Sequence, residues 1–224
     1  MSQSATAGPA ALAEHGTSAV SDALDLLGSP GAVFGPRRLS GAGPLAGPAF
    51  TVAFEPAAPG EPAPAADFLD DVPAGAMVVI ANSGRHCTVW GDILAQVAAR
   101  RGVAGTVIDG YCRDLDGIRA VGYSVWALDA FVRTGKNRVR MVAAQVPVVL
   151  GAGEDAVTVR PGDLVCADGS GVVVVPAALV EEVTGQVDRV ARMEAQVLRD
   201  VAAGLPLREA RAARGYHAVG RRLS

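Results

Sequence analysis

Short apolar runs, each closed by a turn signal, constrain the fold of this chain more than any other feature. A first run, GPAFTVAFEP, covers 47–56, and AMVVIAN (76–82), TVIDG (106–110) and SVWALD (124–129) follow it, the last three separated by amphipathic stretches of helical spacing. From residue 139 onward, further runs succeed one another with only turn residues between them. The pattern predicts an α/β fold in which several strands curl into a barrel-like sheet, without a clean strand–helix–strand repeat.

The length favours one domain over residues 1–224, with a helical C-terminal tail from about residue 176. Half of the residues are apolar but only 4% are aromatic, so the core must consist mainly of Val, Ala, Leu and Ile. A chain of this length buries enough surface to fold without a disulfide or a structural metal. The three cysteines are scattered and odd in number, which argues against a zinc site or a disulfide framework and fits a reducing compartment.

Charge and hydropathy exclude several classes of function. The 20 basic and 23 acidic residues are balanced, and no basic block exists to attract a phosphate backbone, so we expect no nucleic-acid partner. No apolar run reaches the length of about 18 residues that crossing a membrane requires. The first residues lack the pattern of a signal peptide. These features predict a cytoplasmic protein without a membrane partner.

A cation and an anion, Arg113 and Asp114, follow the buried run that ends at Gly110. Side chains just past the end of such a strand are where α/β sheets display functional groups. The guanidinium of Arg113 suits a carboxylate, and the carboxylate of Asp114 suits Mg²⁺ or Mn²⁺, ions that accept one or two protein oxygens. A structural ion pair, with Asp114 capping the next helix, is the alternative. We expect the two charges to address separate partners.

A second candidate is the helix that opens at WGDILAQ. Gly91 allows close approach of a ligand, and the amides of Ile93 and Leu94 in the first turn, together with the helix dipole, favour an anion. Asp92 is either an acid/base group acting through water or only the N-cap of the helix.

Three further residues carry weaker signals. His86 lies in the loop before this helix and is a candidate for substrate contact. Cys112 has no activating histidine nearby in the sequence and is expected to be a bystander. Lys136, the only lysine, lies in the loop RTGKNR and is expected to be away from both motifs. No dinucleotide fingerprint or P-loop is present.

As a set, these stretches resemble the RraA-like family and its branch of 4-hydroxy-4-methyl-2-oxoglutarate/4-carboxy-4-hydroxy-2-oxoadipate aldolases. The resemblance rests on TSAVSDALDLLG, on GPAFTV, on the run from WGDILAQ to YSVWA, and on VRPGDLVCADGSGVVVVPAALVEEV. The loops NSGRHCTVWGD and PGEPAPAADFLDD depart from the family pattern. The resemblance implies a compact α/β/β/α fold around a small barrel, a homotrimer or homohexamer, and an active site between subunits.

The resemblance also implies roles for individual residues. Asp114 would hold a divalent metal, Arg113 would contact a pyruvate moiety, Asp92 would position or protonate through water, and the amides of Ile93 and Leu94 would hold a carboxylate. The resemblance further implies a glutamate donated by the neighbouring subunit, for which Glu194 is the candidate.

The resulting hypothesis is a metal-dependent aldolase that cleaves a 4-hydroxy-2-oxo diacid to pyruvate and also decarboxylates oxaloacetate. Two alternatives remain: a non-catalytic regulator that binds ribonuclease E, and a lyase of a specialised pathway that keeps the enolate step. Relatives of the regulatory kind tend to lack the acid after the arginine, so Asp114 favours the enzyme.

Overall fold

The structure is a computed structural model that describes residues 9–58, 60, 62–63, 67–82 and 85–216. Its strands are β1 (Ala32–Val33), β2 (Arg37–Ser40), β3 (Leu45–Pro56), β4 (Met77–Ala81), β5 (Thr88–Trp90), β6 (Gly105–Cys112), β7 (Val125–Ala130), β8 (Val139–Ala144), β9 (Val148–Leu150), β10 (Val157–Val159), β11 (Leu164–Ala167) and β12 (Val172–Val175). Its α-helices are α1 (Pro9–His15), α2 (Thr17–Leu26), α3 (Asp92–Arg100), α4 (Leu115–Ala120), α5 (Val180–Ala202) and α6 (Leu207–Ala213). Short 3₁₀ turns are η1 (Phe68–Asp71), η2 (Gly153–Asp155) and η3 (Ala177–Leu179). The predicted mixed α/β class is confirmed.

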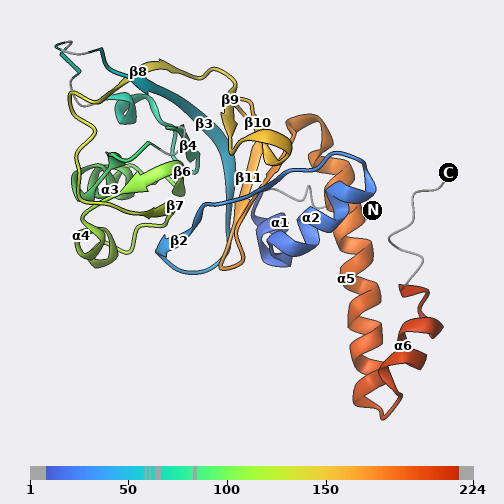
Figure 1. The fold of residues 1–224 in the computed structure, drawn as a ribbon. Helices are drawn as coiled ribbons and strands as arrows, with labels where there is room; N and C mark the ends of the chain where they lie inside the picture. The colour runs from blue at the N-terminus through green and yellow to red at the C-terminus, as the bar shows by residue number, and fades with distance from the viewer. Residues whose placement is uncertain (1–8, 59, 61, 64–66, 83–84, 217–224) are drawn as a thin grey trace, which may run out of the picture.

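The main sheet runs in the order β1-β12-β11-β3-β4-β6-β7-β2, with β5 beside β6 and β8 beside β3. The strands β3, β4, β6 and β7 are parallel, whereas β11, β12 and β8 join antiparallel. The 12-residue strand β3 pairs with β11 at its start, with β4 in its middle and with β8 at its end. It therefore crosses the sheet as one long curved strand (Figure 1), and this curvature gives the sheet its half-barrel shape.

The expectation of no strand–helix–strand repeat was wrong. Helix α3 connects β4 to β6 and α4 connects β6 to β7, and each connection joins neighbouring parallel strands. The repeat is hard to see in the sequence because β5 interrupts the first crossover and α4 has only six residues. The carboxyl ends of β5 and β6 consequently meet the start of α3 at one edge of the sheet.

The core is divided between the two faces of the sheet. Strand β4 is buried on both faces, as expected for the interior of a parallel sheet: Val78 and Ile80 pack under α3 and α4, whereas Met77 and Val79 point into the curl of the sheet. A third apolar cluster lies where α1, α2 and α5 cover β11 and β12. Helix α5 extends beyond the sheet, and α6 lies alongside its distal half (Figure 1).

The start of α2 binds a carboxylate from the turn that follows β11. Gly16 is the N-cap of α2, and Thr17 donates from its backbone amide and its hydroxyl to the carboxylate of Asp168, each at 2.8 Å. Asp168 also accepts from Ser170 and Gly171 in its own turn. The residue therefore joins the start of α2 to the end of β11. None of the helices in the described ranges combines the length and hydropathy needed to cross a bilayer.

Candidate functional site

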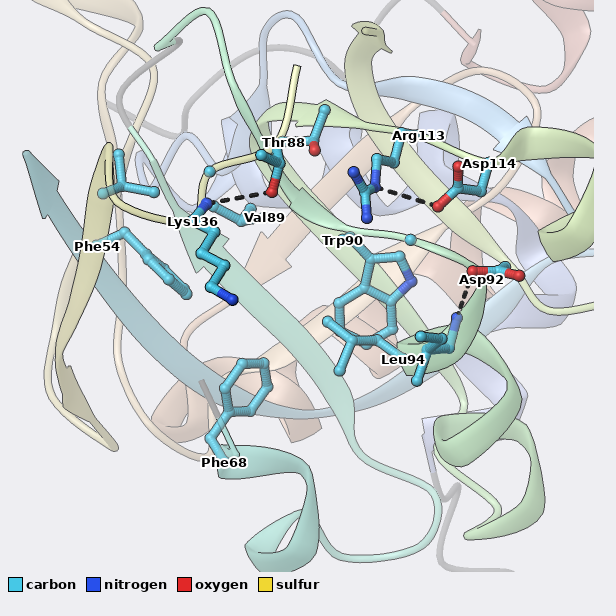
Figure 2. Close-up of a pocket in the computed structure, with 15 residues that line it drawn as sticks. Phe54, Phe68, Thr88, Val89, Trp90, Asp92, Leu94, Arg113, Asp114 and Lys136 are labelled. Carbon is cyan, nitrogen blue, oxygen red and sulfur yellow. Dashed lines mark hydrogen bonds and ion pairs between the residues drawn. The ribbon is translucent and has the colours of Figure 1, made fainter. Parts of the chain in front are cut away.

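A cavity of about 200 Å³ opens where β5 and β6 end and α3 begins. It is lined by Phe54, Phe68, Thr88, Val89, Trp90, Gly91, Asp92, Ile93, Leu94, Arg113, Asp114, Thr134, Gly135, Lys136 and Val139. Arg113, Asp114 and Asp92 gather at one end, and the phenyl rings of Phe54 and Phe68 lie at the other (Figure 2). The volume suits a small metabolite, and the mixture of apolar walls with a few polar groups is typical of a ligand site.

The two charges after β6 form an ion pair. Nε of Arg113 lies 3.2 Å from Oδ2 of Asp114, and both side chains are 42% exposed. The expectation that the two would address separate partners therefore does not describe this structure. Adjacent residues on a helix do not face each other. Asp114, however, is the N-cap of α4 and has left-handed backbone angles (φ 58°, ψ 39°), so its side chain is not bound by helical geometry.

The remaining hydrogen-bonding capacity of this pair is available to a ligand. Among the described residues, Oδ1 of Asp114 and the terminal nitrogens of Arg113 have no protein partner. The pair thus offers a planar donor edge beside a carboxylate oxygen, both lining the cavity.

The start of α3 faces the same end of the cavity. Gly91 is the N-cap, with extended backbone, and Asp92 is the first helical residue, so Asp92 is not the N-cap. The carboxylate of Asp92 accepts a hydrogen bond from the amide of Ile93 at 2.8 Å. This amide, expected to hold an anion, is occupied by a neighbouring side chain, whereas the amide of Leu94 has no acceptor within the described part of the chain.

Two glycines allow these groups to approach one another. A Cβ at Gly91 would lie 2.8 Å from Oδ2 of Asp114, and a Cβ at Gly117 would lie 2.8 Å from Cβ of Asp92. Such separations are shorter than real Cβ contacts, so any side chain at either position would displace the carboxylates. Glycine is therefore needed at both positions for space, and at Gly91 this space is taken by the carboxylate of Asp114.

Lys136 lies in the cavity wall, contrary to the expectation that it is remote from both motifs. The turn that carries Lys136 is attached to β5. Thr134 forms an isolated parallel β-bridge with Thr88, and the amide of Gly135 donates to the carbonyl of Thr88 at 2.9 Å. Its ammonium group points toward the space between Phe54 and Phe68 (Figure 2). One feature of the sequence could have drawn attention to Lys136: it is the only lysine among the 20 basic residues.

The sequence also did not predict that Trp90, Phe54 and Phe68 line the cavity. Trp90 is buried at 2% exposure and stacks on Tyr123, with ring centroids 5.9 Å apart. Its indole Nε1 has no hydrogen-bond partner among the described residues. These aromatic residues come from β5, β3 and η1, which lie far apart in the sequence, so only the folded sheet brings them together.

Two candidate residues lie outside the cavity. His86 is exposed and packs against Tyr111 and Phe131, with ring centroids 5.8 and 6.4 Å away. Glu194 is exposed on α5, on the opposite side of the sheet from α3 and α4 (Figure 1). Neither touches the site within one chain.

The cysteines are buried and free. Burial raises the pKa of Cys112 to about 11, with smaller contributions from Asp129 and Asp114, so its thiol is neutral at physiological pH. A neutral, inaccessible thiol is a poor nucleophile, in accord with the expected bystander role.

The acidic groups suit only some metals. Within the described residues, no three His, Cys, Asp or Glu side chains converge as a closed metal site would require. The free oxygen of Asp114, beside a cavity open to water and ligand oxygens, matches the one or two carboxylates with which Mg²⁺ or Mn²⁺ is commonly held. It does not match the closed nitrogen and sulfur shells of structural zinc.

Fold and site together define an α/β protein with a small cavity, lined by Arg113, Asp114 and Asp92, at the carboxyl ends of parallel strands. Residues 17–174 match the family described as RraA-like, Aldolase/RraA, and the chain belongs to this family. It is 35% identical over 195 residues to protein DlpA of Legionella pneumophila, a match that covers 86% of this chain but only 31% of that longer protein.

Two other relatives bear on function. A protein of Halalkalibacterium halodurans named "Putative 4-hydroxy-4-methyl-2-oxoglutarate aldolase" is 30% identical over 169 residues, covering 75% of each chain. The crystal structure of Streptomyces coelicolor RraAS2, titled an unusual member of the RNase ES inhibitor RraA protein family, is 29% identical with a TM-score of 0.75. It covers 83% of this chain and 92% of that chain. The chain is therefore similar both to a protein named as a putative aldolase and to a member of a ribonuclease-inhibitor family.

Proposed function

We propose that this protein is a divalent-metal-dependent lyase that cleaves a 4-hydroxy-2-oxo diacid to pyruvate and also decarboxylates oxaloacetate. The observation that carries the proposal is the Arg113–Asp114 pair, which lines the same small cavity as the start of α3. The family and its aldolase relatives support a lyase, and a guanidinium beside a metal-binding carboxylate is suited to a 2-oxo acid.

The proposed reaction transfers the C4 hydroxyl proton to a water held by Asp92 and breaks the C3–C4 bond. The electron pair of that bond becomes the double bond of a pyruvate enolate, and the other half departs as a carbonyl compound. Arg113 stabilises the enolate oxygen through its free guanidinium nitrogens. A divalent ion, held by Asp114, supplies a Lewis acid that polarises the 2-oxo group when it is bound.

Asp92 completes the reaction in this proposal. Its carboxylate lies at the same end of the cavity as Arg113 (Figure 2), where it can hold a water that delivers a proton to C3 of the enolate. The free amide of Leu94 is available for the substrate carboxylate at the positive end of α3. Loss of CO₂ from oxaloacetate leaves the same enolate, so one set of residues serves both reactions.

The decisive experiment measures pyruvate release from oxaloacetate and from 4-hydroxy-4-methyl-2-oxoglutarate with Mg²⁺ or Mn²⁺. We expect a chelator to abolish release, and Asp114→Ala to reduce it roughly 100-fold or more, because the carboxylate that holds the metal is lost. Asp116→Ala is the matched control, since Asp116 is fully exposed on α4 outside the cavity. Full activity of Asp114→Ala would overturn the metal assignment.

The position of Lys136 makes a second readout informative. An amine in an aldolase cavity can form an imine with pyruvate, which borohydride reduces to a permanent adduct. The proposed metal route needs no imine, so borohydride treatment with pyruvate should leave the mass of Lys136-containing peptides unchanged. A stable pyruvate adduct on Lys136 would replace the metal mechanism with an imine mechanism.

The second candidate function is regulation of a ribonuclease by protein binding, favoured by the similarity to Streptomyces coelicolor RraAS2. Binding of that kind would not depend on the charged groups inside the cavity. A pull-down with ribonuclease E that persists in Asp114→Ala, combined with no pyruvate release by the wild-type protein, would support the regulator instead.

A further inference from the structure

The chain places its only lysine at the end of the cavity opposite the charged pair. Lys136 belongs to a turn held at two points: its own amide donates to Oγ1 of Thr134 at 3.2 Å, and the amide of Val139 donates to the carbonyl of Gly135 at 2.9 Å. A Cβ at Gly135 would lie 2.5 Å from the carbonyl of Thr88, so the turn packs directly on β5. The backbone that carries the ammonium group is therefore fixed relative to the site.

The ammonium group of Lys136 has no partner among the residues that the structure describes. No carboxylate or carbonyl in that part of the chain accepts a hydrogen bond from Nζ. The acidic side chains that line the cavity are Asp92 and Asp114, and both lie with Arg113 at the other end (Figure 2). An anion is the complement that this end of the cavity lacks.

Lys136 is an exposed residue, but apolar side chains flank its ammonium group on the cavity side. Phe54 and Phe68 lie on either side of it (Figure 2), and an ion pair beside such walls is screened less than one on an open surface. The cavity thus has a charged group at each end and a hydrocarbon wall between them, so it suits a ligand with two anionic ends.

We propose that Lys136 determines specificity by binding the carboxylate of the departing half of the substrate, while Phe54 and Phe68 hold the substituent at C4. This inference rests on the proposed lyase function, in which Arg113 and Asp114 take the pyruvate half. Lys136 then favours a diacid substrate over a monoacid that differs from it only in lacking the terminal carboxylate.

The first test compares kcat/KM for 4-hydroxy-2-oxoglutarate with that for 4-hydroxy-2-oxopentanoate, which carries a methyl group where the diacid carries a carboxylate. The wild-type protein should prefer the diacid, and Lys136→Met should reduce this preference about 10- to 100-fold, through KM more than kcat. Lys136→Arg should retain part of the preference because it keeps the charge.

The matched control is Arg133→Met, which removes one positive charge from the same loop. The guanidinium of Arg133 stacks on Phe131, 5.6 Å from the ring centroid, and does not line the cavity. Its substrate preference should equal that of the wild type. An undiminished preference in Lys136→Met, or an equal loss in Arg133→Met, would overturn the assignment.

A second measurement needs no variant. Reductive methylation with carbon-13 formaldehyde labels the single lysine side chain and retains its charge, giving a lysine signal separate from that of the amino terminus. With Mg²⁺ present, 2-oxoglutarate should shift this signal and 2-oxopentanoate should not. Equal shifts with both acids, or none with either, would contradict the proposal.

The two proposals fail in distinguishable ways. Exchange of the pyruvate methyl protons with deuterium by the wild-type protein reports only on enolate formation, which involves no departing half. If this exchange is lacking, the lyase function fails. If exchange occurs but diacid preference does not depend on Lys136, only the specificity assignment fails.

Discussion

The carboxylate of Asp168 shows how one residue can connect distant parts of this fold. Burial of its side chain favours the neutral form, but hydrogen bonds from Thr17, Ser170 and Gly171 outweigh burial and hold the pKa of Asp168 below its ordinary value of 3.8. The backbone carbonyl of Asp168 also accepts from the indole of Trp126 at 2.8 Å. Helix α2, the end of β11 and strand β7 thus meet at one position.

The lowered pKa predicts how the stability of the protein depends on pH. Because the ionised form is favoured in the folded state, this stabilisation is complete above pH 3.8 and is lost as the pH falls through the folded pKa. Asp168→Asn should lower the free energy of unfolding by roughly 2–3 kcal/mol at pH 7 and by less near pH 3. Urea unfolding at both pH values measures the difference.

The control for this prediction is Asp22→Asn, because Asp22 is exposed on α2 and has no comparable partners. It should change the free energy of unfolding little at either pH. A deficit in Asp168→Asn that stayed equal at pH 7 and pH 3 would show that charge is not the source of the stabilisation.

At the level of elements, the close meeting of β6, α3 and α4 depends on glycine. Gly91→Ala should reduce pyruvate release by about 10- to 100-fold, because the new Cβ displaces the carboxylate of Asp114. The fold should change little, since the extended backbone of Gly91 (φ −154°) accepts any residue. Steady-state kinetics and thermal unfolding of the same preparation test both parts.

Gly185→Ala provides the comparison for this substitution. Gly185 lies within α5 with open space around it, so alanine there should raise the free energy of unfolding by about 0.5–1 kcal/mol and leave kinetics unaltered. If Gly91→Ala kept full activity, the approach of Gly91 to Asp114 would have no part in catalysis.

The sequence predicted most elements because their periodicity is local. The strand at 47–56 corresponds to β3, and the helices α3 and α4 follow their apolar spacing. Strands β2 and β5 were missed because four and three residues are too few to show alternation.

The site was predicted only in part for the same reason. Arg113, Asp114 and Asp92 were found because each follows a recognisable strand or begins a helix. Lys136 and Phe68 were missed because they come from loops whose positions depend on contacts with β5 and with the core. Periodicity within a segment carries no information about such contacts.

At the level of the whole molecule, helix α5 presents a face that the body of the protein does not cover. Glu194, Leu198 and Val201 recur at helical spacing on it, and Leu198 and Val201 are 68% and 37% exposed. Leu205 and Leu207 extend the exposed apolar surface toward α6. Exposed apolar surfaces of this kind mark sites of protein association.

We propose that the homotrimer or homohexamer expected from the family resemblance uses this face. Leu198→Lys with Val201→Lys should shift the molar mass in light scattering toward that of one chain, because two charges replace apolar contacts. Glu181→Gln, an exposed change in the first turn of α5, should leave the mass unaltered. Loss of pyruvate release together with dissociation would support the assignment of Glu194 to a neighbouring site.

The central position of β3 has a consequence for the way the chain is made. On the ribosome, β3 emerges early, but its partners β8 and β11 are completed only at residues 144 and 167. Until then, the backbone amides and carbonyls along part of β3 have no partner, and an open strand edge readily pairs with another nascent chain. We therefore expect rapid overproduction to favour inclusion bodies, and slower translation or a chaperone that shields this edge to raise the yield of folded protein.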